Sequence, residues 1–272
     1  MSVLLENWAL ILALLGCGAV AGFMASIFGV GGGAVVVPAL YQALSFLGVD
    51  EGVRMHISIA TSLAIMIPTS VRSYLSHLKR GAVDTDLLKG WLLLIPLGTV
   101  LASLIAAHLS GDVLKGIFGV MALMVAFKLL FSKDNWRLGS NLPGQPVRGL
   151  YGMLIGFLST LMGIGGGILC NTFMTLFGRP IHQAIATSSG VGVLVSLPGM
   201  IGLLLAGLSA EGLPTFSLGF VNLLAVILIT PVAVLVAPLG VKAAHALSKR
   251  QLELAFGLFL IVVGLRFAAA LF

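Results

Sequence analysis

Two glycine runs contain the residues of this sequence that are best suited to binding chemistry. The first is Gly29-Val30-Gly31-Gly32-Gly33, and the pattern returns as Gly163-Ile164-Gly165-Gly166-Gly167. Glycine lets backbone N–H groups approach a ligand without obstruction by a side chain. A helix that begins after such a turn presents unpaired N–H groups and a partial positive charge. The runs are therefore suited to binding an anion.

A second motif follows each glycine run. His56-Ile57-Ser58-Ile59-Ala60-Thr61-Ser62 follows the first run, and His182-Gln183-Ala184-Ile185-Ala186-Thr187-Ser188 follows the second. Both have the pattern H-x-x-I-A-T-S. Repetition of two motifs in the same order indicates a duplicated unit whose two copies meet around a common site.

The candidate binding residues are the glycines of both runs and the polar side chains near them. They are Gly29, Gly31, Gly32, Gly33, Gly163, Gly165, Gly166, Gly167, Ser26, His56, Thr61, Ser62, Arg72, Asn171, His182, Thr187 and Ser188. The hydroxyl and amide groups would add neutral donors, and the histidines or the arginine would add charge near the path. No Asp or Glu lies deep in an apolar segment, so a cation would lack its usual ligands. We expect an anion site without a metal or a cofactor.

Each candidate also has a structural alternative. Glycines in membrane helices permit close helix packing. His56 and His182 stand at first-turn positions that suit helix capping, and Ser or Thr inside a membrane helix commonly bonds to its own backbone. Arg72 lies close enough to the end of its segment for its side chain to reach the membrane surface.

The composition is that of a membrane protein. Of 272 residues, 59% are hydrophobic and only 9% are charged, whereas soluble domains carry about 25% charged residues. The apolar residues form blocks near the length of about 20 residues that spans a bilayer. Spanning structures are helices or closed barrels, and the blocks lack sustained period-two alternation, so helices are favoured. The net charge of +6 is dispersed at segment ends, which indicates membrane topology rather than nucleic-acid binding.

Ten apolar segments can be assigned in two sets of five. They are 8–28, 34–49, 57–76, 88–109, 113–132, 148–162, 168–178, 182–207, 216–240 and 251–271. The longest polar connection separates the sets, which gives a first membrane repeat at 1–132, a cytoplasmic linker at 133–147 and a second membrane repeat at 148–272. The sequence thus predicts an all-α polytopic membrane protein whose helices are broken at the glycine runs.

The basic residues support ten crossings. If all segments cross, one side receives Lys79, Arg80, Lys89, Lys133, Arg137, Arg148, Arg179, Lys242, Lys249 and Arg250, and the other receives Arg54, Lys115 and Arg266. That asymmetry follows the positive-inside rule, whereas eight crossings with two re-entrant segments would divide the charges almost evenly. The linker is then cytoplasmic and both termini are outside. Five crossings per half make the halves inverted repeats, which are typical of secondary transporters.

The paired motif resembles the sulfite exporter TauE/SafE family, also called the toluene sulfonate uptake permease family. In each half, G-F-x-x-x-x-x-G-[VI]-G-G-G precedes H-x-x-I-A-T-S, and the resemblance extends over essentially the whole chain. It implies a transporter, not an enzyme, that moves sulfite, sulfoacetate, thiosulfate or organosulfonates across the bacterial cytoplasmic membrane. The halves differ, because Arg72, Tyr74 and His77 follow the first A-T-S where Pro198 and Gly199 follow the second. An asymmetric site is expected.

The leading hypothesis is a secondary transporter, working as an exporter of a small sulfur oxyanion or organosulfonate by alternating access. An outward gradient or proton coupling could drive it. A passive anion channel would use the same residues without alternation. An intramembrane hydrolase is a further alternative, because Gly207-Leu208-Ser209 has the G-x-S spacing of a serine nucleophile. That alternative lacks a G-x-G-D or H-E-x-x-H motif.

Overall fold

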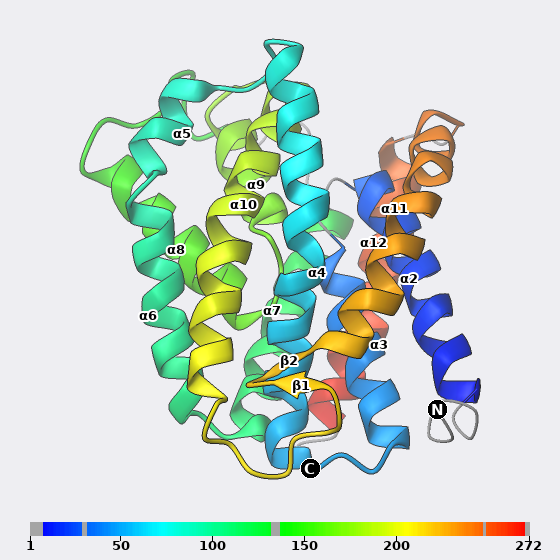
Figure 1. Ribbon diagram of the computed structural model, residues 1–272. Helices are drawn as coiled ribbons and strands as arrows, with labels where there is room; N and C mark the ends of the chain where they lie inside the picture. Colours follow the sequence, from blue (N-terminus) through cyan, green and yellow to red (C-terminus); the bar gives the residue numbers. More distant parts are fainter. Residues whose placement is uncertain (1–7, 29–31, 132–136, 247–248, 270–272) are drawn as a thin grey trace.

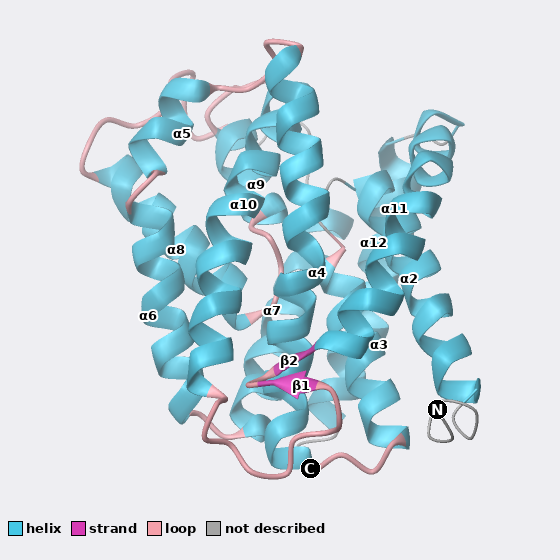
Figure 2. Cartoon of the chain, viewed as in Figure 1, coloured by secondary structure: helices cyan, strands magenta, loops and turns pink. Residues whose placement is uncertain are grey.

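Eleven α-helices form most of the part of the chain that the computed structural model describes, which is residues 8–28, 32–131, 137–246 and 249–269 (Figure 1). The helices are α2 (Trp8–Phe28), α3 (Gly33–Phe46), α4 (Glu51–Lys79), α5 (Thr85–Trp91), α6 (Leu94–His108), α7 (Gly111–Phe131), α8 (Val147–Leu161), α9 (Gly167–Leu176), α10 (Ile181–Ala206), α11 (Leu223–Ala246) and α12 (Lys249–Ala269). A small antiparallel hairpin of β1 (Ser217–Leu218) and β2 (Val221–Asn222) precedes α11 (Figure 2).

Seven of the ten predicted segments lie within three residues of a helix at both ends. Segment 57–76 is the middle of a longer helix, α4 (Glu51–Lys79), and two further segments differ in kind. Segment 88–109 is divided between α5 and α6, which are bent by 43° relative to one another. Pro96 lies in the first turn of α6 and has no N–H to continue a helix from the preceding turn. Segment 216–240 begins as the β-hairpin and becomes helical only at Leu223. Phe216 and Gly219 both have positive φ angles there, which a helix does not allow.

Several helices can cross a membrane by length and composition. Among the described residues these are α7, α10 and the stretch Leu223–Gly240 of α11, and the bent pair α5–α6 qualifies as a unit. By contrast, α3 and α9 have 14 and 10 residues. At about 1.5 Å per residue each is shorter than a hydrocarbon core of about 30 Å. The fold is that of an all-α membrane protein that contains two short helices, each preceded by a glycine run.

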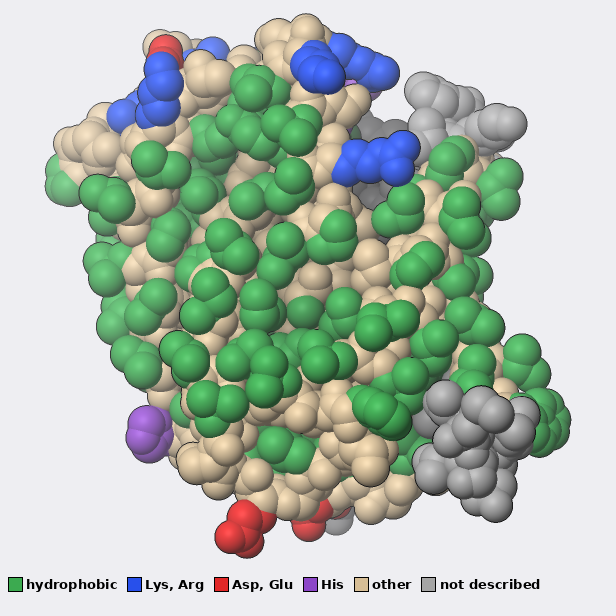
Figure 3. All heavy atoms as spheres, in the orientation of Figure 1, with side chains coloured by type: hydrophobic (Ala, Val, Ile, Leu, Met, Phe, Trp, Pro, Cys, Tyr) green, Lys and Arg blue, Asp and Glu red, His purple; other side chains and the backbone are tan. Residues whose placement is uncertain are grey.

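Charge divides the molecule into two ends. Helix α4 runs from one end to the other, from Glu51 in its first turn to Lys79 in its last. Lys and Arg side chains gather at the upper end of the view in Figure 3, and Asp and Glu at the lower end, with hydrophobic side chains between them. We call these the basic end and the acidic end. The start of α2 and the end of α12 lie toward the acidic end (Figure 1).

Glycines bring helices of the two halves into backbone contact. Helix α2 packs along α11, and α6 packs along α8. A Cβ at Gly22 would clash with the backbone of Ala233, and a Cβ at Gly156 would clash with the carbonyl oxygen of Ile95. Small residues allow this close approach in membrane proteins, where van der Waals packing stabilises helix pairs.

The backbone contact at Gly156 yields a stability prediction. Substitution Gly156→Ala should destabilise the protein by about 1–3 kcal/mol, because α6 and α8 must separate to admit the methyl group. The measurement is thermal unfolding in detergent. Substitution Gly16→Ala is the matched control, since nothing lies within 4 Å of a Cβ at Gly16. Equal stability of the two variants would contradict the packing argument.

Candidate functional site

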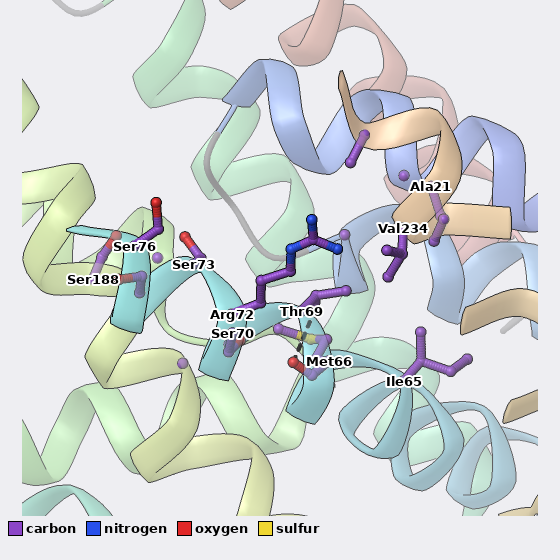
Figure 4. Close-up of a pocket in the computed structure, with 18 of the residues that line it drawn as sticks. Ala21, Ile65, Met66, Thr69, Ser70, Arg72, Ser73, Ser76, Ser188 and Val234 are labelled. Carbon is purple, nitrogen blue, oxygen red and sulfur yellow. Dashed lines mark hydrogen bonds between the residues drawn. The ribbon is translucent and has the colours of Figure 1, made fainter. Parts of the chain in front are cut away.

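A cavity of about 710 Å³ lies between α4 and α10 on one side and α2, α3 and α11 on the other (Figure 4). Both glycine runs reach it, through Gly32 from the first and Gly165 and Gly167 from the second. Its polar side chains are Thr69, Ser70, Arg72, Ser73, Ser76, His77, Arg80, Ser188 and Ser189. None of the described residues that line it is acidic.

The glycine runs give the cavity two helix N-termini. Gly32 precedes α3 with φ of 76°, and Gly166 precedes α9 with φ of 73°. These are left-handed conformations that glycine adopts without steric cost. Neither helix has a side-chain cap. The first N–H groups of both helices are therefore available to another acceptor.

The second run leaves backbone donors without acceptors. Among the described residues, none accepts a hydrogen bond from the N–H groups of residues 165–169. Residues 165–168 are buried. Unpaired N–H groups in a protein interior are rare and energetically costly. Together with the partial positive charge of a helix N-terminus, these donors favour an anion beside α9.

Helix α4 supplies the cations of the cavity. Thr69, Ser73, Ser76 and Arg80 are spaced at three or four residues and share one helix face. In Figure 4, Arg72 extends from α4 into the space between α4 and the elements that carry Ala21 and Val234. No described acidic side chain forms an ion pair with Arg72. Its guanidinium is thus free to bind a ligand.

Ser70 is the buried hydroxyl of this lining. Its side chain is 7% exposed, and it makes no hydrogen bond to any described residue. Its Oγ atom keeps contact with solvent through the cavity, so water can bond to it until a ligand takes the place of that water. An anion in the cavity would provide an acceptor for it.

The structure brings some of the predicted site residues to the cavity and places others elsewhere. Gly32, Gly165, Gly167, Arg72 and Ser188 line it. Gly33 and Gly163 instead pack against each other, because a Cβ at Gly33 would clash with the carbonyl oxygen of Gly163. Gly29, Gly31 and the side chain of Ser26 lie outside the described residues.

The two predicted histidines and Asn171 do not line the cavity. The Nδ1 atom of His56 lies 3.1 Å from the carbonyl oxygen of Gly52, and its Nε2 atom lies 3.0 Å from that of Ala106. Its ring also stacks on Phe220, so His56 joins α4 to α6 near the acidic end. His182 is exposed in the first turn of α10, and the Oδ1 atom of Asn171 is buried in α9 without a hydrogen-bond partner.

The threonines of the two A-T-S triplets make equivalent contacts across the halves. The Oγ1 atom of Thr61 accepts a hydrogen bond from the backbone N–H of Asn222 at 2.9 Å. That of Thr187 accepts one from the backbone N–H of Asp84, also at 2.9 Å. Asp84 in turn caps α5, and Asn222 accepts from the N–H of Ala225 at the start of α11. Each threonine thus holds the residue that begins a helix in the other half.

The serines of the triplets divide between packing and the cavity. Ser62 donates to the carbonyl oxygen of Gly163 at 2.9 Å and so ties α4 to the second glycine run. Ser188 donates to the carbonyl oxygen of Ile185, one turn back in α10, and also lines the cavity. Of the four candidate hydroxyls in the triplets, three therefore have structural partners in the other half of the chain.

Sequence reasoning missed part of the cavity lining. Thr69, Ser70, Ser73, Ser76 and Arg80 were not among the candidates, although they surround Arg72 in the sequence. A signal was present, because hydroxyls and basic residues recur at helical spacing through an otherwise apolar segment. Such a polar stripe in a membrane helix faces protein or water rather than lipid.

The sequence is similar to those of membrane transport proteins. The sequence model of the family described as "Sulfite exporter TauE/SafE" matches residues 14–267. A "Probable membrane transporter protein" of Haemophilus influenzae is 35% identical, over 94% of this chain and 97% of that protein. One of the same description from Methanocaldococcus jannaschii is 29% identical over 91% of each chain, and "Probable membrane transporter protein YunE" of Bacillus subtilis is 28% identical over 70% of this chain and 77% of that protein. No solved structure matches the chain.

The threonine contacts can be tested by removing the hydroxyl alone. Substitution Thr187→Val should lower stability by about 1–3 kcal/mol, because the N–H of Asp84 then lacks its acceptor. The readouts are thermal unfolding and hydrogen exchange at the amide of residue 84. Ser189→Ala is the control, since that hydroxyl bonds only to Ala186 in its own helix. If Thr187→Val lost anion binding but kept its stability and amide protection, a ligand role would replace the structural one.

Proposed function

The chain belongs to the sulfite exporter TauE/SafE family, and we propose that it is a secondary transporter that exports small sulfur-containing anions from the bacterial cytoplasm. Family and relatives identify a multi-pass membrane transport protein. Sulfite and organosulfonates are the proposed substrates. The observation that carries this proposal is the cavity, whose lining has cationic and hydroxyl side chains but no acid among the described residues.

The donor set suits a sulfonate or sulfite group. These groups present three oxygen atoms, and an arginine can donate two parallel hydrogen bonds to two of them. Arg72 would supply that pair, while Ser70 and the amides beside α9 supply donors from another direction. Positive charge at the two helix N-termini adds to the attraction. A cation would meet repulsion from Arg72 and from both helix N-termini.

We infer that the structure represents a state open to the cytoplasm. The basic end should face the cytoplasm by the positive-inside rule, and Ser76, His77 and Arg80 place the mouth of the cavity toward that end. The acidic end is tied together by Lys115, which is 1% exposed and lies 2.6 Å from oxygen atoms of both Glu51 and Asp112. Tyr41 of α3 also donates to Glu51 at 3.1 Å. These bonds join α3, α4 and α7 and would hold the outer side shut.

We further propose that residues 1–132 and 148–272 are inverted five-segment repeats joined by a cytoplasmic linker, with ten segments in all and both termini outside. Equivalent pairings support this. The packing of α2 on α11 corresponds to that of α8 on α6, and the contact of Thr61 with Asn222 corresponds to that of Thr187 with Asp84. Alternating access would then be a rocking of α2, α3 and α11 against α4 and α10, with the cavity between them.

The two alternatives fit the structure less well. A passive channel needs a continuous path, but Gly33 packs on Gly163 and the ion pairs of Lys115 join the helices at the acidic end. A hydrolase needs a nucleophile with a general base beside it. Ser209 is exposed in the loop after α10 and bonds to no described side chain. Saturation and counter-flow of sulfite in proteoliposomes would distinguish a carrier from a channel.

Removal of the Arg72 cation should impair the transporter. Substitution Arg72→Gln should weaken sulfite binding and flux by about 10- to 100-fold, because a hydrogen bond to a charged group is worth about 1.5–3 kcal/mol. The measurements are ligand-dependent thermal shift and flux into proteoliposomes. Lys89→Gln is the matched control, since Lys89 is 77% exposed on α5 and pairs with Asp86. Stabilisation by sugars or metal cations but by no sulfur anion would overturn the proposal.

The enzymatic alternative has its own test. Substitution Ser209→Ala should leave sulfite flux unchanged, because Ser209 lies in a loop outside the cavity. Flux is measured in proteoliposomes at matched protein density. A hydrolytic activity that disappears with this substitution would revive the alternative.

A further inference from the structure

We call the part of the cavity beside Gly32, Gly165 and Gly167 the cavity floor. The charged groups around it can be counted one by one. Arg72, His77 and Arg80 are the only titratable side chains in the described lining; the first two belong to α4, and Arg80 is its C-cap residue. Helices α2, α3 and α11 contribute small or apolar residues, and α10 contributes Ser188 and Ser189 as its polar groups. No carboxylate offsets the positive charge among these residues.

Of these three groups, Arg72 lies nearest along α4 to Met66, whose side chain adjoins Gly165. Arg80 is eight residues further along α4, which corresponds to about 12 Å along the helix axis. His77 lies five residues beyond Arg72, which is about 7.5 Å further along the helix axis toward the end of α4. A small anion beside the glycine runs would therefore contact Arg72 directly, while His77 and Arg80 stand nearer the mouth and raise the local anion concentration.

The two helix N-termini add to this cation. Each N-terminus carries the equivalent of about half a positive charge. Helices α3 and α9 both begin within the cavity lining, at Gly33 after Gly32 and at Gly167. Arg72 and the two helix ends together present the equivalent of about two positive charges to one small volume.

We propose that the cavity floor is matched to a dianion and selects doubly charged oxyanions over singly charged ones of the same shape. This inference rests on the proposed transport function and narrows its substrates to dianions such as sulfite and sulfoacetate, so singly charged organosulfonates would be the poorer ligands. A monoanion would leave about one positive charge uncompensated. That matters when the cavity closes, because water then leaves and an unbalanced buried charge is strongly unfavourable. Ser70, which is 7% exposed and has no described partner, provides a donor for the additional charge density of a dianion.

The test compares two ligands of nearly equal shape and different charge. Methylphosphonate and methanesulfonate both carry three oxygen atoms on a tetrahedral centre, but at about pH 9 the first is a dianion and the second a monoanion. His77 is neutral at that pH, so its titration does not enter the comparison. Binding to the purified full-length protein is measured by calorimetry at constant ionic strength. We expect methylphosphonate to bind at least about tenfold more tightly.

Three variants identify the origin of the preference. Arg72→Gln should reduce the ratio of the two affinities to below about threefold, because the floor then matches a monoanion. Arg72→Lys restores the charge and should restore much of the preference, which separates an electrostatic role from a folding defect. Arg80→Gln should lower the ratio much less than Arg72→Gln does, since Arg80 stands nearer the mouth and its charge acts on the bound ligand from further away.

The outcomes separate this inference from the function on which it rests. Equal affinity for the two ligands in the natural protein would overturn dianion selection while leaving an anion transporter intact. Unchanged selection in Arg72→Gln would also overturn it, because the preference would then arise elsewhere. If sulfite, methylphosphonate and methanesulfonate all failed to bind, the proposed function itself would fall, and dianion selection with it.

Discussion

Unpaired backbone N–H groups inside the bundle are the constraint on which the rest of the structure depends. A helix that begins within a bilayer exposes its first amides where lipid offers no acceptor. Helix α9 begins inside the helix bundle at Gly167, directly after a run of buried glycines. Such a start is tolerable only if protein surrounds it or a ligand reaches it. The chain does both, because long helices enclose the short ones and a cavity reaches the glycine runs.

The enclosing helices come from both halves of the chain, so neither half is complete alone. Helix α2 lies along α11, and α8 lies along α6, in each case through glycines that remove the space between backbones. Thr61 and Thr187 then bond across the halves to the residues that begin α11 and α5. In a bilayer, packing and hydrogen bonds must stabilise helix pairs without a hydrophobic driving force. Small residues and hydroxyls therefore hold this fold together.

Hydropathy and repetition predict the helices well, because both report on burial in lipid. The segments 8–28 and 148–162 differ from α2 and α8 by at most one residue at either end. The same signal failed at 216–222, where an apolar stretch forms a hairpin, since strands and helices bury equally apolar residues. Hydropathy and repetition also could not predict which group each polar side chain contacts. Thr187 and Ser188 are neighbours in the sequence, yet one bonds to Asp84 and the other lines the cavity. Only the packing of α10 against α4 decides which hydroxyl points where.

The two halves share the order of their motifs and helices, but their residues at equivalent positions in α4 and α10 differ. This difference bears on the proposed alternating access. Nine residues after Thr61 comes Ser70, and nine residues after Thr187 comes Ser196. Ser70 lines the cavity, whereas the Oγ atom of Ser196 is fully buried and has no hydrogen-bond partner. A buried hydroxyl of this kind calls for a physical reason.

On the proposed rocking motion, the inverted half would open at the acidic end and expose the region around Ser196 as the present cavity closes. Arg72 has no such counterpart, because Pro198 occupies the equivalent position. A single cation near the floor would then serve both states, while the neutral donors around it change.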